Sequence, residues 1–446
     1  MEEKSPSPRV SKPSRDRVGE EGSLRQDSAP SNTPKSKDES SNQAGLTLRR
    51  ILLWGILIRL LFMPFTSSTD LLWPYHRGYL WITGGNYTPG ITFMIDYLHG
   101  IFLWLMRPFL YPYFHSMWNI PWGSTHPITG QQVSQMLRTF FTFVSHPGIF
   151  RILFFLKLPY LFFDVACAFL LLKSTGRNAF RFWMLNPVII FVSSIYGRYE
   201  VIAIFFIILS VYLWQKDLRE LSFFALGFSA LLRIYPLLLF PFFLVAGRDK
   251  PRRLPASILA GLIPILPLFL MRGGANTGIT QLPYLDYLLS MNFFLGLHST
   301  LYIFVIGYLL LLFCFFYSGK GSEQGIIYYL TLFFLFLFAT TYFHAQFYAW
   351  LIPFLAMVVN DNREIERFFY FSLIFYFLYL FQWGRVNSVY LFAPLNPARI
   401  ASMPSLSELL NPQTFHRFMG LVRSALSASL FWMMFMLARR KWRETD

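Results

Sequence analysis

The chain has 446 residues, of which 54% are hydrophobic, 20% aromatic and only 14% charged, and its mean hydropathy is +0.43. Soluble domains carry about 25% charged residues, so this composition excludes an ordinary soluble protein and predicts a multi-pass membrane protein. The net charge of +16 does not indicate nucleic-acid binding, because Lys and Arg gather in short connectors between apolar runs, which is the positive-inside pattern.

Residues 1–48 lack aromatic side chains and are rich in Ser, Pro, Lys, Arg and Glu. Such a segment cannot bury enough apolar surface to offset the entropy of ordering, so we predict a disordered cytoplasmic tail. The first apolar run starts only at Ile51, which argues against a cleavable signal peptide. We interpret this run as an uncleaved anchor whose start is held inside by Arg49 and Arg50.

Residues 67–150 are predicted to form the first outer loop, on the exterior or lumenal side of the membrane. The loop is mixed in character, because the apolar stretch from Ile91 to Leu105 is interrupted by Asp96 and His99. This mixture favours helices that lie in the membrane interface. The alternative is that residues 91–110 form a true span.

The remaining apolar segments predict an all-α, polytopic transmembrane bundle over residues 49–438. With both termini cytoplasmic, the number of spans is expected to be even, ten to twelve. The segments are 151–172, 183–197, 199–215, 222–247, 255–271, 299–317, 326–343, 346–359, 368–383 and 418–438. Segment 222–247 contains Arg233 and Pro236 and is predicted to be a broken pair of short helices. A late outer loop at 384–416 and a cytoplasmic tail at 439–446 complete the prediction.

Asp70 lies just beyond the first apolar run, with Trp73, Tyr75, His76 and Arg77 close behind it. A carboxylate at the outer face is suited to act as a general base toward an acceptor hydroxyl. The alternative is an ordinary solvated loop aspartate.

Lys157 and Asp164 are seven residues apart, which places them two helical turns apart on one face, pointing into a common interior. Charges inside a span are costly and are usually partnered. Either a catalytic role or a structural ion pair is compatible with this spacing. The two cysteines, Cys167 and Cys314, lie inside apolar runs, which argues against a disulfide or metal framework.

Two further motifs carry arginine toward the predicted outer face. The turn Gly197-Arg198-Tyr199-Glu200 is predicted to expose Arg198 and Glu200, and the planar guanidinium of Arg198 is suited to bind a phosphate. Arg233, followed by Tyr235 and Pro236, places a permanent cation where the segment breaks. The alternatives are that Arg198 and Glu200 cap the hairpin, and that Arg233 pairs with Glu200 or Asp164.

The segment from His344 to Trp350 predicts a polar and aromatic rim between two spans, formed by His344, Gln346, Tyr348 and Trp350. Together, these sets predict an outer-facing site for a sugar acceptor and a phosphate-bearing lipid. The sequence contains no glycine-rich nucleotide motif and no convincing metal-ligand spacing.

The order of these motifs resembles that of the GT-C superfamily of polytopic glycosyltransferases. The likeness is strongest to the bacterial and archaeal branch that uses polyprenyl-phosphate sugars, is more distant to the GPI mannosyltransferases, and covers most of residues 50–438. Asp70 matches the family's acidic residue in the first outer loop, and the segments 185–187 (Leu-Asn-Pro) and 350–353 (Trp-Leu-Ile-Pro) match short family motifs. Arg198 and Glu200 depart from the family's Gln and Asp, and Arg233 replaces a lysine.

The resemblance implies transfer of a hexose, with mannose as the leading candidate, from a polyprenyl-phosphate monosaccharide to a lipid-linked or cell-envelope glycan, with inversion. Asp70 would be the base, and Arg198 and Arg233 would stabilise the leaving phosphate. The residues that would line the site are Glu200, Tyr235, His344, Gln346, Tyr348 and Trp350. No metal or other cofactor is expected, because the leaving group is already an anionic phosphate.

The membrane would be the plasma membrane of a prokaryote or the endoplasmic reticulum of a eukaryote. Two other classes of protein fit the same composition. One is a transporter or flippase of lipid-linked sugars, and the other is a non-catalytic membrane assembly subunit. A transporter often carries internal repeats and mid-membrane charges, whereas the charges here are predicted to cluster at one face.

Overall fold

The computed structural model describes residues 37–89, 93–122, 130–267, 285–297, 299–318, 323–359 and 362–443. These residues are mostly helical, which confirms the predicted helical class at this level. They also include an antiparallel hairpin formed by β1 (Asn292–Gly296) and β2 (Ser299–Tyr302). The chain divides into two units, Met1–Leu46 and Thr47–Asp446, and the second unit contains every predicted site residue.

The first half of the chain forms helices of very different lengths and one π-helical turn, η1. Their bounds are α1 (Lys37–Phe62), α2 (Thr69–Thr83), α3 (Phe93–Leu110), α4 (Tyr113–Ser116), α5 (Gly130–Val144), α6 (Ile149–Ser174), α7 (Arg177–Met184), α8 (Pro187–Ile190), η1 (Phe191–Tyr196), α9 (Glu200–Gln215) and α10 (Arg219–Leu232).

The second half alternates apolar helices with short 3₁₀ turns. Its elements, besides the β-hairpin, are η2 (Tyr235–Leu239), α11 (Phe240–Gly247), α12 (Leu254–Leu262), η3 (Ile263–Ile265), α14 (Leu285–Leu288), α15 (Ile303–Tyr317), α16 (Glu323–Thr340), η5 (Ala345–Trp350), α17 (Ile352–Val359), α18 (Arg363–Tyr379), η6 (Leu380–Trp383), η7 (Val389–Leu395), α19 (Pro397–Ser402), α20 (Leu406–Leu409) and α21 (Pro412–Arg443).

Two described helices are long and apolar enough to cross a bilayer, namely Ile149–Ser174 in α6 and Pro412–Arg440 in α21. A third candidate span is the pair Arg177–Met184 and Pro187–Tyr196, whose two parts are bent by 46°. These helices support a membrane protein. The remaining apolar helices, such as α9 and α15, have 10–17 residues, whereas a crossing needs about 20. The total of ten to twelve spans therefore stays a prediction.

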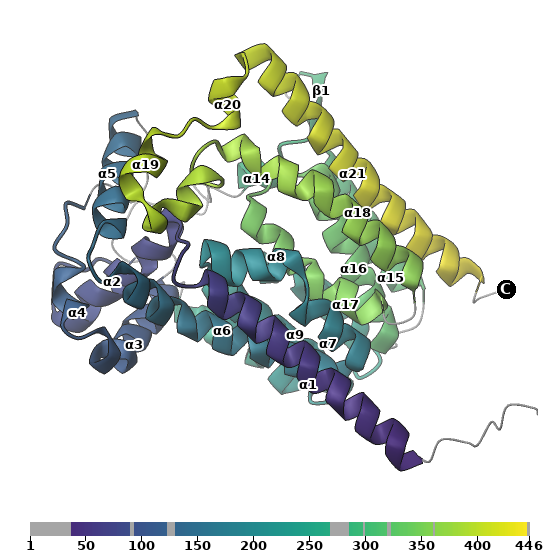
Figure 1. Ribbon diagram of the computed structural model, residues 1–446. Helices are drawn as coiled ribbons and strands as arrows, with labels where there is room; N and C mark the ends of the chain where they lie inside the picture. Colours follow the sequence, from purple (N-terminus) through teal and green to yellow (C-terminus); the bar gives the residue numbers. More distant parts are fainter. Residues whose placement is uncertain are drawn as a thin grey trace, which may run out of the picture. The chain divides into compact units, whose positions relative to one another are not determined.

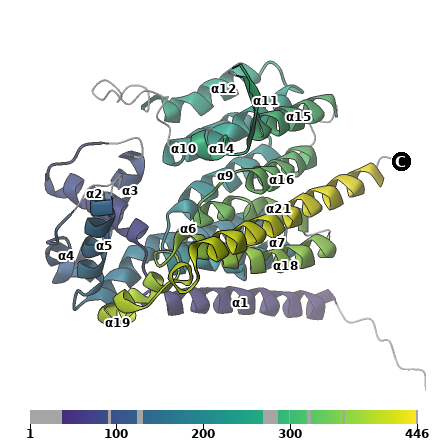
Figure 2. The same cartoon turned by 90° about the horizontal axis from the view of Figure 1, so that it is seen from above.

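The helices pack as a series of neighbours (Figures 1 and 2). In both views, α2 to α5 lie together at one end of the fold. From there, α6 contacts α3 on one side and α9 on the other, and α9 is followed in space by α10 and α12. On the opposite flank α21 packs against both α16 and α18, while α17 lies between α7 and α16. This order places α6 and α9 centrally, between the α2–α3 pair and the later helices.

The predicted first outer loop is largely helical, since 67–150 contains α2, α3, α4 and α5. Helices α2 and α3 approach so closely that a Cβ atom added to Gly78 would lie 2.4 Å from the backbone nitrogen of Gly100. Only two glycines can face each other at that separation, so this contact fixes where α2 crosses α3.

The predicted break in 222–247 is confirmed, because α10 ends at Leu232 and the 3₁₀ turn η2 begins at Tyr235. Pro236 has no backbone N–H to donate and cannot continue α10, which accounts for the position of the break. Arg233, in extended backbone, is the first residue past the helix. Of the predicted disordered tail, residues 1–36 lie outside the described residues, and α1 begins at Lys37.

Candidate active site

Asp70 lies at the start of α2, two residues after the N-cap Ser68, and its side chain is 36% exposed. The hydroxyl of Tyr196 donates to Asp70 Oδ2 over 3.0 Å. Arg198 Nη1 lies 3.6 Å from the same oxygen and 3.3 Å from the Asp70 carbonyl. The carboxylate is thus held from the protein side and is also reachable from outside.

Arg198 and Glu200 are positioned by the turn at Gly197, which has φ +73° and ends η1. A side chain at position 197 would be strained in this left-handed conformation, and its Cβ would also lie 2.9 Å from Lys157 Cε. Glycine therefore allows α9 to start beside α6, with Glu200 in its first turn.

Glu200 is fully buried and forms an ion pair with Arg233. The pair is bidentate: Arg233 Nε donates to Glu200 Oε2 at 3.2 Å, and Nη2 donates to Oε1. Trp350 Nε1 adds a third hydrogen bond to Oε2, at 3.0 Å. The guanidinium of Arg233 also lies over the Tyr199 ring, 4.4 Å from its centroid. Of the alternatives open for Arg233, pairing with Glu200 is the one that the structure contains.

Arg198 is held less tightly than Arg233. Its nearest carboxylate oxygens are 3.6 Å away on Asp70 and 3.9 Å away on Glu200, both beyond ordinary hydrogen-bond length. Within the part of the chain that the structure describes, its buried Nε has no hydrogen-bond partner. An unsatisfied buried donor is costly, so Arg198 is the cation of this cluster that gains most from an incoming anion.

The charges of the cluster act on one another. Burial disfavours the Asp70 carboxylate, but Arg198, His344, Tyr196 and Arg233 together lower its pKa below the usual 3.8. Asp70 is therefore ionised at neutral pH. Burial lowers the pKa of His344 below 6.5 despite the opposing pull of Asp70, so its imidazole is neutral at pH 7.

His344 precedes the 3₁₀ turn η5 and stacks on Trp383, with ring centroids 5.5 Å apart. The segment that carries His344 is held in place by α21, because Arg423 Nη2 donates to the carbonyl oxygens of Phe338 and Thr341 at 2.8 and 2.7 Å. Arginine thus satisfies the free carbonyls at the end of α16, just before the His344 segment.

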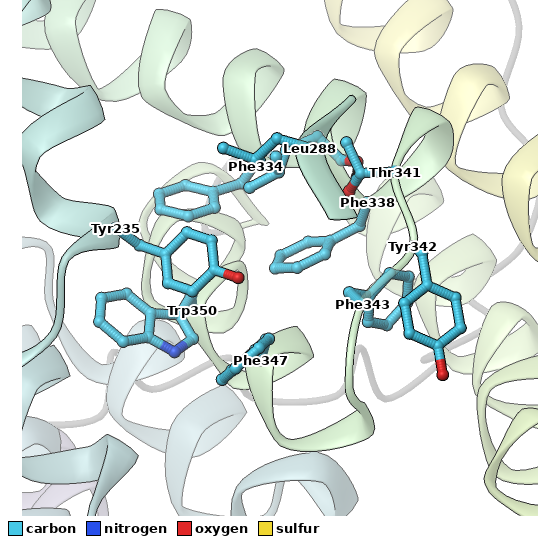
Figure 3. A pocket seen from close by; sticks show the side chains of 10 residues that line it. Tyr235, Leu288, Phe334, Phe338, Thr341, Tyr342, Phe343, Phe347 and Trp350 are labelled. Atoms are coloured by element: carbon cyan, nitrogen blue, oxygen red, sulfur yellow. Dashed lines mark hydrogen bonds between the residues drawn. The ribbon is translucent and has the colours of Figure 1, made fainter. Parts of the chain in front are cut away.

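The other predicted rim residues separate into two groups. Gln346 and Tyr348 are buried, and Tyr348 packs on Tyr376 with ring centroids 4.7 Å apart, so it belongs to the core. Tyr235 and Trp350 line an aromatic pocket together with Phe347 and, across from them, Tyr342 (Figure 3). Its free volume is about 10 Å³, room for roughly one water molecule. No sugar or prenyl group fits there unless side chains move.

Lys157 and Asp164 are both fully buried but do not pair with each other. Lys157 Nζ donates to the carbonyl oxygens of Thr66 and Ser194, at 2.6 and 2.8 Å. This ammonium ties α6 to the chain that leads into α2 and to the π-helical turn η1. Lys157 is thus a structural link immediately behind the Asp70 cluster.

Both carboxylate oxygens of Asp164 accept two hydrogen bonds each from buried donors. Arg59 Nε lies 2.7 Å from Oδ2 and Nη2 lies 3.1 Å from Oδ1. Trp183 Nε1 donates to Oδ1 at 2.8 Å, and Ser193 Oγ donates to Oδ2 at 2.6 Å. With four donors around one carboxylate, the expected ion pair exists, but its cation is Arg59 of α1. For Asp164, the structure supports a structural ion pair rather than a catalytic role.

Sequence reasoning assigned no role to Arg59, Tyr196 or Asn387. The role of Arg59 could have been predicted, because an arginine inside an apolar run requires a buried partner. Tyr196 and Asn387 offered no such indication: the Tyr196 hydroxyl lies 2.9 Å from Asn387 Oδ1, and the two are 191 residues apart. Among the described residues, no group of three or more His, Cys, Asp or Glu side chains is arranged to hold a metal ion.

The candidate active site therefore consists of Asp70, Tyr196, Arg198, Glu200, Arg233 and His344, which come from the start of α2, the η1–α9 turn, the α10–η2 break and the start of η5. Comparisons with protein-family models, curated protein sequences and solved structures found no match.

Proposed function

We propose that this chain is a membrane glycosyltransferase that moves a hexose, with mannose as the first candidate, from a polyprenyl-phosphate monosaccharide to a lipid-linked or cell-envelope glycan. The observation that carries the proposal is the position of a reachable, ionised carboxylate, Asp70, next to an arginine, Arg198, whose hydrogen bonds are incomplete. A base beside an incompletely bonded cation suits sugar transfer from a phosphate leaving group.

In the proposed reaction, the acceptor hydroxyl oxygen forms a bond to C1 of the sugar on the face opposite to the phosphate. The bond between C1 and the phosphate oxygen breaks, and the polyprenyl phosphate leaves with the electron pair. Asp70 accepts the hydroxyl proton. Arg198 binds the phosphate oxygens as their charge increases, and its positive charge stabilises the leaving phosphate.

Arg233 has a different role in this proposal. Its guanidinium is engaged by Glu200, and breaking a buried pair leaves a costly unpaired charge. We assign the Glu200–Arg233 pair to positioning, since it fixes the start of α9 beside the Arg198 turn. Trp350, bonded to the same carboxylate, extends this support to η5.

The test is transfer of radiolabelled mannose from polyprenyl-phosphate mannose to membrane lipids by the purified protein in liposomes. The variant Asp70→Asn keeps the shape and removes the base, so we expect transfer to fall by about 10²–10⁴-fold. Asp96→Asn is the matched control: Asp96 is a carboxylate on the neighbouring helix α3, where it forms an ion pair with Arg77 Nε at 2.9 Å. That variant should keep its activity.

Three outcomes would contradict the proposal. Equal transfer by wild type and Asp70→Asn would remove Asp70 as the base. Movement of intact mannosyl lipid across the liposome membrane, without transfer to an acceptor, would identify a flippase instead. A protein with neither activity, in which Asp70→Asn still supports growth, would be an assembly subunit.

A further inference from the structure

A second site lies where the start of α18 meets the end of α21. The two helices pack side by side (Figure 1), and the C-terminal part of α21 borders the first turns of α18. An open pocket of about 500 Å³ lies between them, lined by residues of both helices and by the N-cap Asn362. None of the residues of the candidate active site lines this pocket.

The pocket is positively charged. Arg367 of α18 and Arg439 and Arg440 of α21 line it, against a single lining carboxylate, Glu364. In the described ranges, no ion pair joins Arg367 or Arg439 to a carboxylate. The neighbouring Glu366 is engaged elsewhere, 3.0 Å from Arg181 Nη2. The excess positive charge is therefore available to an anion.

The remaining wall of the pocket is apolar and aromatic. Trp432 and Phe435 are 48% and 52% exposed and lie with their ring centroids 5.4 Å apart. Phe368 of α18 completes this wall, 6.2 Å from the ring of Trp432. Trp432 and Phe435 lie in the last turns of the candidate span Pro412–Arg440, which Arg439 and Arg440 end. Cations beside an exposed aromatic wall match a molecule with an anionic head and an apolar body.

We infer that this pocket binds an anionic phospholipid, with Arg367 and Arg439 on the headgroup phosphate and with Phe368 and Phe435 along an acyl chain. Basic pockets between helices on the cytoplasmic side of a membrane bind such headgroups, and 439–446 is the predicted cytoplasmic tail. The inference does not depend on the proposed glycosyl transfer, because the pocket is separate from the Asp70 cluster. The competing explanation is general attraction of the basic connectors to the membrane surface, which would need no pocket.

The experiment is native mass spectrometry of the detergent-purified, delipidated protein with phosphatidylglycerol or phosphatidylcholine of identical chains. We expect selective retention of one phosphatidylglycerol. In the double variant Arg367→Gln/Arg439→Gln, the affinity for phosphatidylglycerol should fall roughly tenfold, because both cations that attract the headgroup phosphate are removed. Phe435→Ala should weaken the binding of long-chain phosphatidylglycerol while leaving the binding of a short-chain phosphatidylglycerol unchanged.

The matched control is Arg177→Gln/Arg252→Gln, which removes the same charge from two exposed arginines of other predicted cytoplasmic connectors. Unchanged binding in this control supports a defined site. An equal fall in both double variants would overturn the inference, since it would show general attraction only. Equal binding of both lipids would also overturn it, as would complete displacement of the lipid by inorganic phosphate.

Discussion

At the scale of single residues, the protein contains two kinds of charged group. Asp164 accepts from Arg59, Trp183 and Ser193, so its oxygens are saturated and nothing remains to bind a substrate. Asp70 and Arg198 are the opposite case, being close together but loosely bonded. A complete polar network favours one rigid arrangement, whereas an incomplete one retains binding capacity.

The saturated network predicts a large effect of Asp164→Ala on stability. Removing the carboxylate leaves Arg59 buried without its partner, at a cost of about 3–5 kcal/mol in the free energy of unfolding. The double variant Arg59→Met/Asp164→Leu removes both charges and should lose less. Thermal unfolding in detergent measures both variants. A single variant as stable as the double variant would show that the pair is not a buried network.

At the scale of elements, the position of Asp70 depends on how α2 packs on α3. The two helices touch at Gly78 and Gly100, and Asp70 lies about two turns before that contact on α2. A change at the crossing should therefore shift the carboxylate with the whole helix. Similarly, Arg423 of α21 fixes the end of α16 and with it the segment that carries His344.

The crossing predicts that Gly78→Ala destabilises the protein by about 1–3 kcal/mol, because the new methyl group meets backbone atoms that cannot rotate away. Gly420→Ala in α21 is the control, since a Cβ there meets nothing within 4 Å and alanine favours the helix by up to about 1 kcal/mol. Denaturation in detergent compares the two. The prediction fails if Gly78→Ala is as stable as Gly420→Ala.

At the scale of the whole molecule, the proposed function requires that the Asp70 cluster and the basic connectors lie on opposite sides of the membrane. The basic connectors determine the orientation through the positive-inside rule. The exposed loop after α2, which contains Asn86, belongs to the outer side in this arrangement.

This arrangement predicts the labelling of engineered cysteines by a membrane-impermeant maleimide. In a Cys314→Ser background, needed because Cys314 is exposed, Asn86→Cys should react in sealed vesicles whose outer or lumenal face points outward. Arg177→Cys should react only after the vesicles are opened. Labelling of both cysteines from one side would contradict the proposed orientation.

Local features were predictable from the sequence because their causes are local. The break after Leu232 follows from Pro236 within the next turn, and the turn at Gly197 follows from a glycine between two apolar runs. The placement of Asp70 after the first helix follows from where apolar character ends. The number of spans stays a prediction, because helices such as α9 have only 10–17 residues, whereas a crossing needs about 20.

The sequence by itself determined that this is a mostly helical chain with membrane-spanning character, and which few charges interrupt its apolar segments. These properties depend on composition and on spacing over a few turns. Only the tertiary structure decided the partners: Arg59 rather than Lys157 for Asp164, Glu200 for Arg233, and Tyr196 with Arg198 for Asp70. The partners are 33 to 128 residues apart, so each pair exists only after the helices pack. Packing leaves Arg198 incompletely bonded and Arg233 engaged, and this difference singles out one arginine as the proposed phosphate ligand.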